Sequence, residues 1–178
     1  GLGDGTGELR AMSADGSVIV GGSVIWDANN GIRSLSQVFT ESGIAGFESW
    51  SLSAIGVSAD GRTIVGEGTN PDGNQEGWRV VLPVNAAAPV FNAFPAGLYS
   101  VQAGQPITLT ASAFDPDGHL VQYRLLGNVP IGVNFLGGDF SWTPTNDDVG
   151  SHSFTIRAYD NGVPSRFIDT QFAITVTA

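Results

Sequence analysis

The second half of the chain is a series of short segments in which apolar and polar residues alternate, separated by Gly, Pro, Asn or Asp. Such alternation gives a segment one apolar and one polar face, which is typical of a half-buried β-strand. The segments are residues 107–113, 121–125, 140–142, 154–158 and 172–176. Evenly spaced strands of this kind predict an immunoglobulin-like β-sandwich.

The core of this sandwich must hold together without covalent links, because the chain contains no cysteine. The same absence excludes thiolate metal sites and cysteine nucleophiles. Trp142 is the residue expected at the centre of the core, because one buried indole supplies a large apolar area. We expect its replacement by alanine to cost on the order of 3 kcal/mol or more.

The first half of the chain contains an internal repeat. The segment MSADGSVIVG at residues 12–21 recurs as VSADGRTIVG at residues 57–66, and each copy precedes a segment with a tryptophan, Trp26 or Trp78. Asp-Gly before a β-branched run predicts a hairpin turn, since glycine supplies the positive φ that the turn needs. A period near 45 residues is typical of a propeller blade or a similar β-hairpin array.

Two copies are too few to close a propeller, so the repeat region is incomplete by itself. The strands that would complete its core are expected from a longer parent chain, from identical subunits or from the second half of this chain. We therefore predict an all-β protein with two domains, a propeller-blade-like repeat region over residues 1–84 and a sandwich over residues 85–178. The proline-flanked stretch at residues 83–89 is expected to be an extended linker. Residues 41–46 are consistent with either a brief helix or a loop.

Charge excludes several classes of partner. The formal net charge is −10, and all seven cationic residues are arginine. A nucleic-acid binder needs a basic stripe, and an anionic membrane repels so acidic a chain, so neither partner is expected. No apolar run is long enough to span a bilayer, and without lysine there is no Schiff-base chemistry. Acidity suits cation binding and solubility outside the cell.

Two strand ends carry the residues that suggest a metal site. Asp115 and Asp117 follow one apolar run, and Asp160 follows another in the stretch Asp-Asn-Gly. Carboxylates delivered by two strand ends can converge on calcium, which takes oxygen ligands in flexible geometry. The alternative is that both stretches are plain turns, for which Asp, Pro, Asn and Gly are equally suited.

Two resemblances add to this interpretation. Residues 1–83, through the repeated SADG segments and Trp26-Asp27, resemble the HAF family of extracellular repeats in secreted or surface proteins of bacteria. Residues 86–178 resemble the He_PIG immunoglobulin-like or dystroglycan-type cadherin-like domain, through the stretches DPDG, FSWTPT and DNGVP at residues 115–118, 140–145 and 160–164.

The second resemblance implies an extracellular spacer or adhesion module with calcium at these turns. Carried over, it makes Asp115, Asp117 and Asp160 the candidate ligands, with Asn85 or a linker carbonyl completing the shell. His119 departs from the pattern, because an acidic residue is common there. One carboxylate fewer is expected to weaken calcium binding to a Kd of about 10⁻⁴–10⁻³ M.

Catalysis is not expected. The only histidines, His119 and His152, fall at predicted strand ends where an exposed histidine is ordinary. Asp147 and Asp148 are neighbours in a predicted turn and are not placed like the two facing carboxylates of a glycosidase.

Three functions remain, and we predict the first of them, a surface or filament component, because the unpaired strand edges of an incomplete repeat region invite strand addition from a neighbour. The first is a self-assembling structural or adhesive protein of the cell surface, either a homo-oligomer or part of a longer chain. The second is a module that binds a glycan or another cell-surface ligand through exposed Trp26, Trp50 or Trp78. The third is an accessory region of a larger secreted enzyme.

Overall fold

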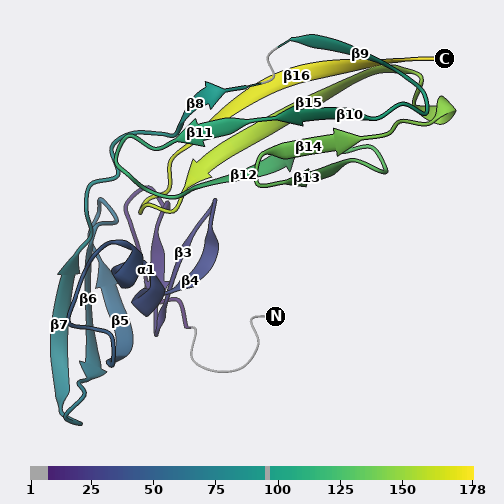
Figure 1. The fold of residues 1–178 in the computed structure, drawn as a ribbon. Coiled ribbons are helices and arrows are strands. Elements are labelled where there is room, and N and C mark those ends of the chain that lie inside the picture. Colours follow the sequence, from purple (N-terminus) through teal and green to yellow (C-terminus); the bar gives the residue numbers. More distant parts are fainter. Residues whose placement is uncertain (1–7, 95–96) are drawn as a thin grey trace. The chain divides into compact units, whose positions relative to one another are not determined.

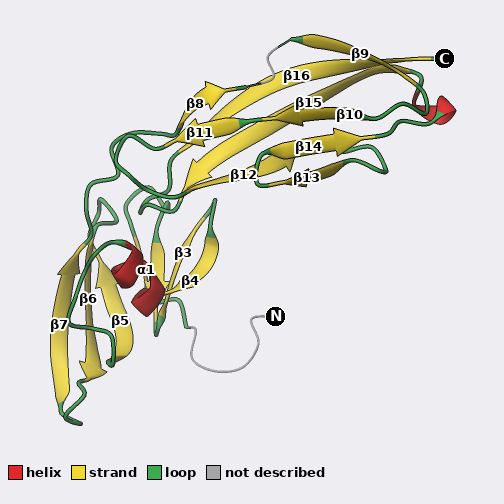
Figure 2. Ribbon diagram, viewed as in Figure 1, coloured by secondary structure: helices red, strands yellow, loops and turns green. Residues whose placement is uncertain are grey.

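The computed structural model describes residues 8–94 and 97–178, so the first seven residues of the predicted repeat region lie outside it. The chain divides into two compact units (Figure 1). The first consists of Gly1–Ala86 with Gly162–Ser165, and the second of Ala87–Asn161 with Arg166–Ala178. The regular secondary structure of each unit is mainly β-strand, as the sequence predicted (Figure 2).

The first unit contains two antiparallel sheets with the strand orders β1-β2-β3-β4 and β5-β6-β7. The first sheet comprises β1 (Ala11–Met12), β2 (Ile19–Gly21), β3 (Val24–Asp27) and β4 (Gly31–Ser34). The second comprises β5 (Ser51–Val57), β6 (Thr63–Thr69) and β7 (Gln75–Val81). The sheets meet where the N–H of Ala54 donates to the carbonyl of Gly22 at 2.7 Å.

Both predicted Asp-Gly turns are present in this unit. Gly16 and Gly61 have φ angles of 72° and 75°, in the left-handed region that favours glycine. The carboxylates of Asp15 and Asp60 accept the backbone N–H groups two residues further on, at 3.0 and 3.1 Å. The repeated sequence therefore produces the same local turn twice.

The two copies nevertheless bury opposite faces of their strands. In the first copy Val20 is fully buried, whereas its counterpart Val65 is 37% exposed and the preceding Ile64 is buried. The tryptophans also differ in register, because Trp26 lies opposite Ile19 while Trp78 lies opposite Gly66. Alternation makes both faces available, and packing selects a different one in each copy.

One helix, α1 (Leu35–Glu41), lies between the two repeats. It begins directly after β4, where the Ser34 hydroxyl accepts the N–H of Gln37 at 3.1 Å as an N-cap. Its apolar side buries Leu35, Val38 and Phe39 in the core of this unit. For residues 41–46, where the sequence allowed either a helix or a loop, the helix ends at Glu41. Residues 42–50 form turns and loop.

The second unit is a sandwich made of three sheets. The largest has the order β12-β15-β16-β9, and the others are β10-β14-β13 and β11-β8. Its strands are β8 (Val90–Ala93), β9 (Leu98–Gln102), β10 (Ile107–Thr110), β11 (Ser112–Phe114), β12 (Val121–Leu126), β13 (Asn134–Leu136), β14 (Asp139–Trp142), β15 (Gly150–Asp160) and β16 (Phe167–Thr177), with a short 3-10 helix at Asn146–Asp148.

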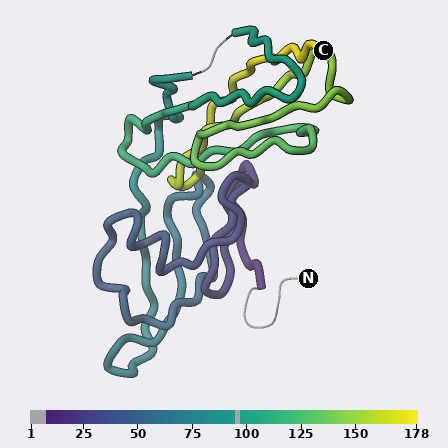
Figure 3. The backbone as a smooth tube through the Cα atoms, turned by 45° about the vertical axis from the view of Figure 1, so that its right-hand side comes forward, coloured from purple at the N-terminus to yellow at the C-terminus, as the bar shows by residue number. Residues whose placement is uncertain are grey.

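The hairpin of β15 and β16 is the longest pairing in this unit, and its strands run side by side in both ribbon and tube views (Figure 3). Trp142 is 1% exposed and packs with its ring centre 5.8 Å from that of Phe154, so its predicted place in the core is confirmed. The predicted strand at residues 107–113 is wrong in one respect. It breaks at Ala111, because β10 pairs with β14 while β11 pairs with β8.

The described part of the chain contains no helix with the length and apolar character needed to cross a bilayer.

Candidate metal centre

The turn between β11 and β12 carries the candidate metal ligands. The N–H of Gly118 donates to the carbonyl of Asp115 at 3.1 Å, and Gly118 has a φ of 86°. Asp115 Oδ1 accepts the backbone N–H groups of Asp117 and His119 at 2.9 and 3.1 Å. The side chain of Asp115 thereby determines the path of the whole turn, which is the usual role of Asp at such a position.

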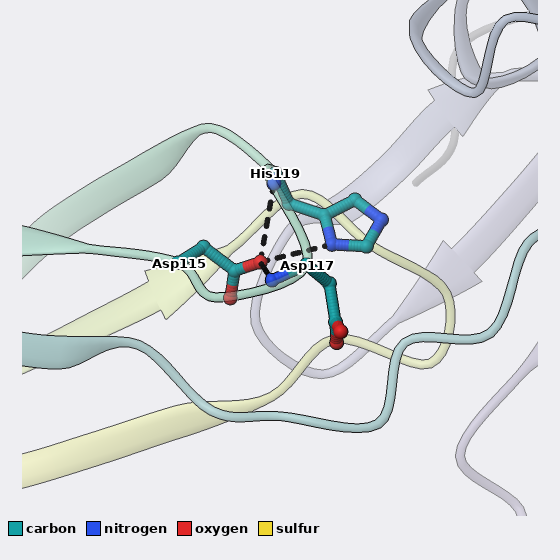
Figure 4. Close-up of side chains that lie close together, drawn as sticks. All are labelled: Asp115, Asp117 and His119. Atoms are coloured by element: carbon teal, nitrogen blue, oxygen red, sulfur yellow. Dashed lines mark hydrogen bonds and ion pairs between the residues drawn. The ribbon is translucent and has the colours of Figure 1, made fainter.

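Asp115, Asp117 and His119 form a cluster in which one ligand atom from each lies within 4.8 Å of the others (Figure 4). His119 Nδ1 lies 3.2 Å from Asp115 Oδ1, and the histidine side chain is only 17% exposed. The expectation of an exposed His119 is therefore wrong, because the turn folds the ring back onto the carboxylate. His119 follows Asp115 by four residues across an Asp-Gly turn, and this spacing could have indicated the contact from the sequence.

The other oxygen of Asp115 is the unusual atom of the site. The Asp115 side chain has no exposed area, and its Oδ2 has no hydrogen-bond partner among the described residues. A buried polar atom without a partner costs about 1–3 kcal/mol, so native proteins rarely keep one. A bound cation would satisfy this oxygen.

The donor set fits calcium through its oxygens. Asp115 Oδ2 and the Asp117 carboxylate are hard donors of the kind that calcium takes. Asp117 is oriented by the N–H of Ala87, which donates to its Oδ2 at 2.8 Å. The imidazole of His119 is not a calcium ligand, and its role in this arrangement is the contact with Asp115 Oδ1.

Asp160 lies outside this three-residue cluster, although its turn is a neighbour. Its carboxylate is fully buried and accepts the N–H of Arg166 at 3.0 Å, which closes the turn between β15 and β16. Asn161 Oδ1 accepts the N–H of Leu120 at 3.0 Å and so ties the two turns together. The role of Asp160 as a ligand stays a prediction.

Asn85 belongs to the first unit and is also buried. Its Nδ2 donates to the carbonyl of Pro164 at 2.9 Å within that unit. The contacts thus give Asn85 a role in holding the segment Gly162–Ser165, and its role as a ligand likewise stays a prediction.

His152 is also not the exposed residue that the sequence suggested. It lies in β15, with its ring 5.0 Å from that of Trp142. Its Nε2 lies 2.7 Å from the carbonyl oxygen of Asp148. His119 therefore contacts a residue of its own turn, and His152 contacts the core residue Trp142. That the chain is not a catalyst remains an expectation.

The tryptophans of the first unit differ in how accessible they are. Trp78 is only 7% exposed, and its Nε1 donates to the carbonyl of Glu67 at 2.9 Å, so the expectation that it is free to bind a ligand is wrong. Trp50 is half-buried and lines a cavity of about 260 Å³. The other residues of that cavity are Ser23, Ser34, Ser36, Ser51 and Leu52.

The fold of the second unit defines an immunoglobulin-like β-sandwich protein, with the acidic turn at one strand end. The model of the family described as "Putative Ig domain" (He_PIG) matches residues 88–177, half of the chain, so the protein belongs to this family. Among curated proteins, none matches the chain significantly.

Several solved structures are similar to the chain. Human CDH23 EC21-23 is 19% identical with a TM-score of 0.44, over 97% of this chain and 57% of that one. Drosophila N-cadherin EC1-4 is 13% identical with a TM-score of 0.41, over 97% and 40%. A nucleoside hydrolase-related hypothetical protein from Saccharophagus degradans, associated with carbohydrate metabolism, is 21% identical with a TM-score of 0.41, over 51% and 25%. In each case this chain spans less than two thirds of the matched chain.

Proposed function

We propose that the chain is a non-enzymatic, extracellular structural and adhesive module of a bacterial surface protein, which assembles with further copies of itself. In this proposal the first unit is a HAF-like repeat region, and the second is a cadherin-like sandwich that binds calcium weakly at the turn of Asp115 and Asp117. Membership of the He_PIG family supports the extracellular setting.

The single observation that carries the calcium site is the buried, unpartnered Oδ2 of Asp115, a residue that forms a cluster with Asp117 and His119. A folded turn that keeps a carboxylate oxygen out of water without a donor is destabilised unless a cation enters. The net charge of −10 adds a general attraction for cations.

Thermal unfolding of the whole chain with calcium and with EDTA tests this proposal. A Kd of about 10⁻⁴–10⁻³ M predicts stabilisation by about 1.4–2.7 kcal/mol at about 10 mM calcium. Asp115→Asn should abolish this gain, while Asp147→Asn, an exposed carboxylate of the same unit, should retain it. An unchanged midpoint for the wild-type chain would remove the metal site. Calcium-dependent clumping of beads coated with the chain would test adhesion separately.

A second candidate function, binding of a carbohydrate, is favoured by the cavity beside Trp50. Its four serines offer hydroxyl groups, and the indole offers an apolar face on which a sugar ring can lie. A neighbouring cavity of about 490 Å³ shares Ser23, Ser51 and Leu52 and adds Glu8 and Arg10. Such polar groups around one aromatic ring are typical of a small-molecule site.

Glycan-array binding followed by titration tests this second candidate. Trp50→Ala should lose binding, and Trp26→Ala, a half-buried tryptophan that does not line the cavity, should keep it. Equal binding by Trp50→Ala and the wild-type chain would exclude this cavity as the site.

A further inference from the structure

Among residues 8–94 and 97–178, the strand β7 is the last strand of its sheet and pairs only with β6. The N–H of Leu82, just beyond this strand, donates to the carbonyl of Arg62 at 2.9 Å. This bond shows which residues of β7 form hydrogen bonds with β6 and which do not. In an antiparallel ladder alternate residues bond the partner, so the backbone groups of Gly77, Arg79 and Val81 face away from β6. All three residues are exposed, and Figure 1 shows β7 at the edge of its sheet.

Natural edge strands are usually protected from such exposure. Common devices are charged side chains, above all lysine, together with proline, a bulge or a covering segment. The sequence QEGWRVV of β7 has neither proline nor lysine, and its register with β6 is regular over all seven residues. The bulge of this sheet lies in the pairing of β5 with β6, near Ala54 and Gly56. Of these devices β7 has charge alone, at the exposed side chains of Glu76 and Arg79, and nothing interrupts its backbone.

The internal repeat indicates what belongs beside β7. Gly21 and Gly66 are equivalent in the repeat, and they pair with Val24 of β3 and Trp78 of β7. Val24 and Trp78 are therefore equivalent positions. One and three residues further on, Ile25 and Asp27 of β3 are equivalent to Arg79 and Val81 of β7. In the first repeat, Ile25 and Asp27 pair with Arg33 and Gly31 of β4. The open edge of β7 is thus the position that a fourth strand occupies in the first repeat.

In the part of the chain that the structure describes, the other sheet of this unit ends in an open edge as well, at β4. Leu35 donates to the carbonyl of Ser23 at 2.9 Å, so the backbone N–H and carbonyl of Ile32 face away from β3, whereas Ser34 leads into α1 as its N-cap. Ile32 is 46% exposed and Val81 on β7 is 43% exposed. Each open strand therefore presents an exposed aliphatic side chain together with unpaired backbone groups.

We propose that β7 of one copy binds β4 of a second copy by strand addition, so that copies join head to tail. This inference rests on the self-assembly in the proposed function and names the surfaces that carry it. Backbone hydrogen bonds across the new pair would extend two sheets into one. Because the two edges differ, the contact is heterologous and does not close on itself by a two-fold axis.

A symmetric pairing of β7 with β7 is less favourable. Centred on Arg79, it sets two guanidinium groups opposite each other, and like charges directly opposite destabilise a sheet. Whole chains carrying a net charge of −10 also repel each other, so association should strengthen as salt screens that repulsion.

Sedimentation equilibrium of the whole chain tests the proposal, carried out in EDTA so that it is independent of calcium. The wild-type chain should associate increasingly with concentration and with salt. Arg79→Pro and Ile32→Pro each remove one outward N–H group at a strand edge, where proline is tolerated. Each variant alone should be monomeric, whereas a mixture of the two should form dimers and nothing larger, because each variant supplies the edge that the other lacks. Arg79→Ala, which keeps the N–H group, should associate like the wild-type chain.

Circular dichroism establishes that each variant is folded, and Val81→Lys provides a second test of the same edge without a change in the backbone. A lysine there should weaken association as lysine does at natural edge strands. A wild-type chain that stays monomeric at every concentration would overturn the proposal. So would Ile32→Pro chains that associate as strongly as the wild type. Loss of the calcium effect with association intact would refute the metal site alone.

Discussion

Phe172 offers the sharpest test of how the sandwich is held together. Its side chain is 3% exposed and lies at the centre of four other aromatic rings. It stacks on Phe154 with ring centres 5.1 Å apart and meets Phe140 edge to face at 5.3 Å. Phe172→Ala should therefore cost about 3–5 kcal/mol, because it removes both the buried ring and its contacts and leaves a cavity.

Hydrogen exchange of the whole chain, read by mass spectrometry, is the suitable assay because it resolves the second unit from the first. With about 1.4 kcal/mol for each factor of ten, the protected amides of β15 and β16 should exchange faster by about two to three and a half orders of magnitude. Amides of β5 and β6 should be unchanged, since they lie in the other unit.

The matched control is Phe167→Ala on the same strand. Phe167 is 45% exposed and packs mainly against the Arg157 guanidinium, 3.7 Å from its ring centre. Its loss should cost no more than about 1 kcal/mol, the value typical of an exposed cation–π contact. A cost below about 1 kcal/mol for Phe172→Ala, or equal costs for the two variants, would refute the assignment of the core to this aromatic cluster.

Three further predictions concern the first unit. Hydrogen bonds from the backbone N–H and the hydroxyl of Ser17 lower the pKa of the Asp15 carboxyl to about 2, so its stabilising effect is present above pH 4 and is lost as the pH falls toward 2. Asp15→Asn should accordingly flatten the acid side of a plot of melting temperature against pH. Ser34→Ala should cost about 1 kcal/mol in denaturant unfolding, because it removes the N-cap of α1. Gly66→Ala should destabilise the first unit by about 1–3 kcal/mol or more, seen as faster hydrogen exchange of β5 and β6, because a Cβ there would clash with the Ser53 carbonyl and the Trp78 ring.

The metal cluster shows how far local sequence carries the site. Asp115 and Asp117 could be predicted together because two residues in one turn stay close whatever the rest of the chain does. Asp160 comes from a different turn, and its burial and contact with Arg166 depend on how β15 and β16 pair. The inward position of His119 likewise depends on the path of the turn, which residue type alone does not specify.

Strand alternation determined most of the architecture from the sequence alone, since a period of two is local and survives any packing. It identified the segments that form β10, β11, β12, β14, β15 and β16 and placed Trp142 on an apolar face, but it did not identify β8, β9 or β13. Alternation states which side chains share a face, but it does not state which face meets another layer. Tertiary packing alone therefore decided that Val20 is buried while Val65 is exposed, that the strand breaks at Ala111, and that β7 keeps an open edge where β3 is covered by β4.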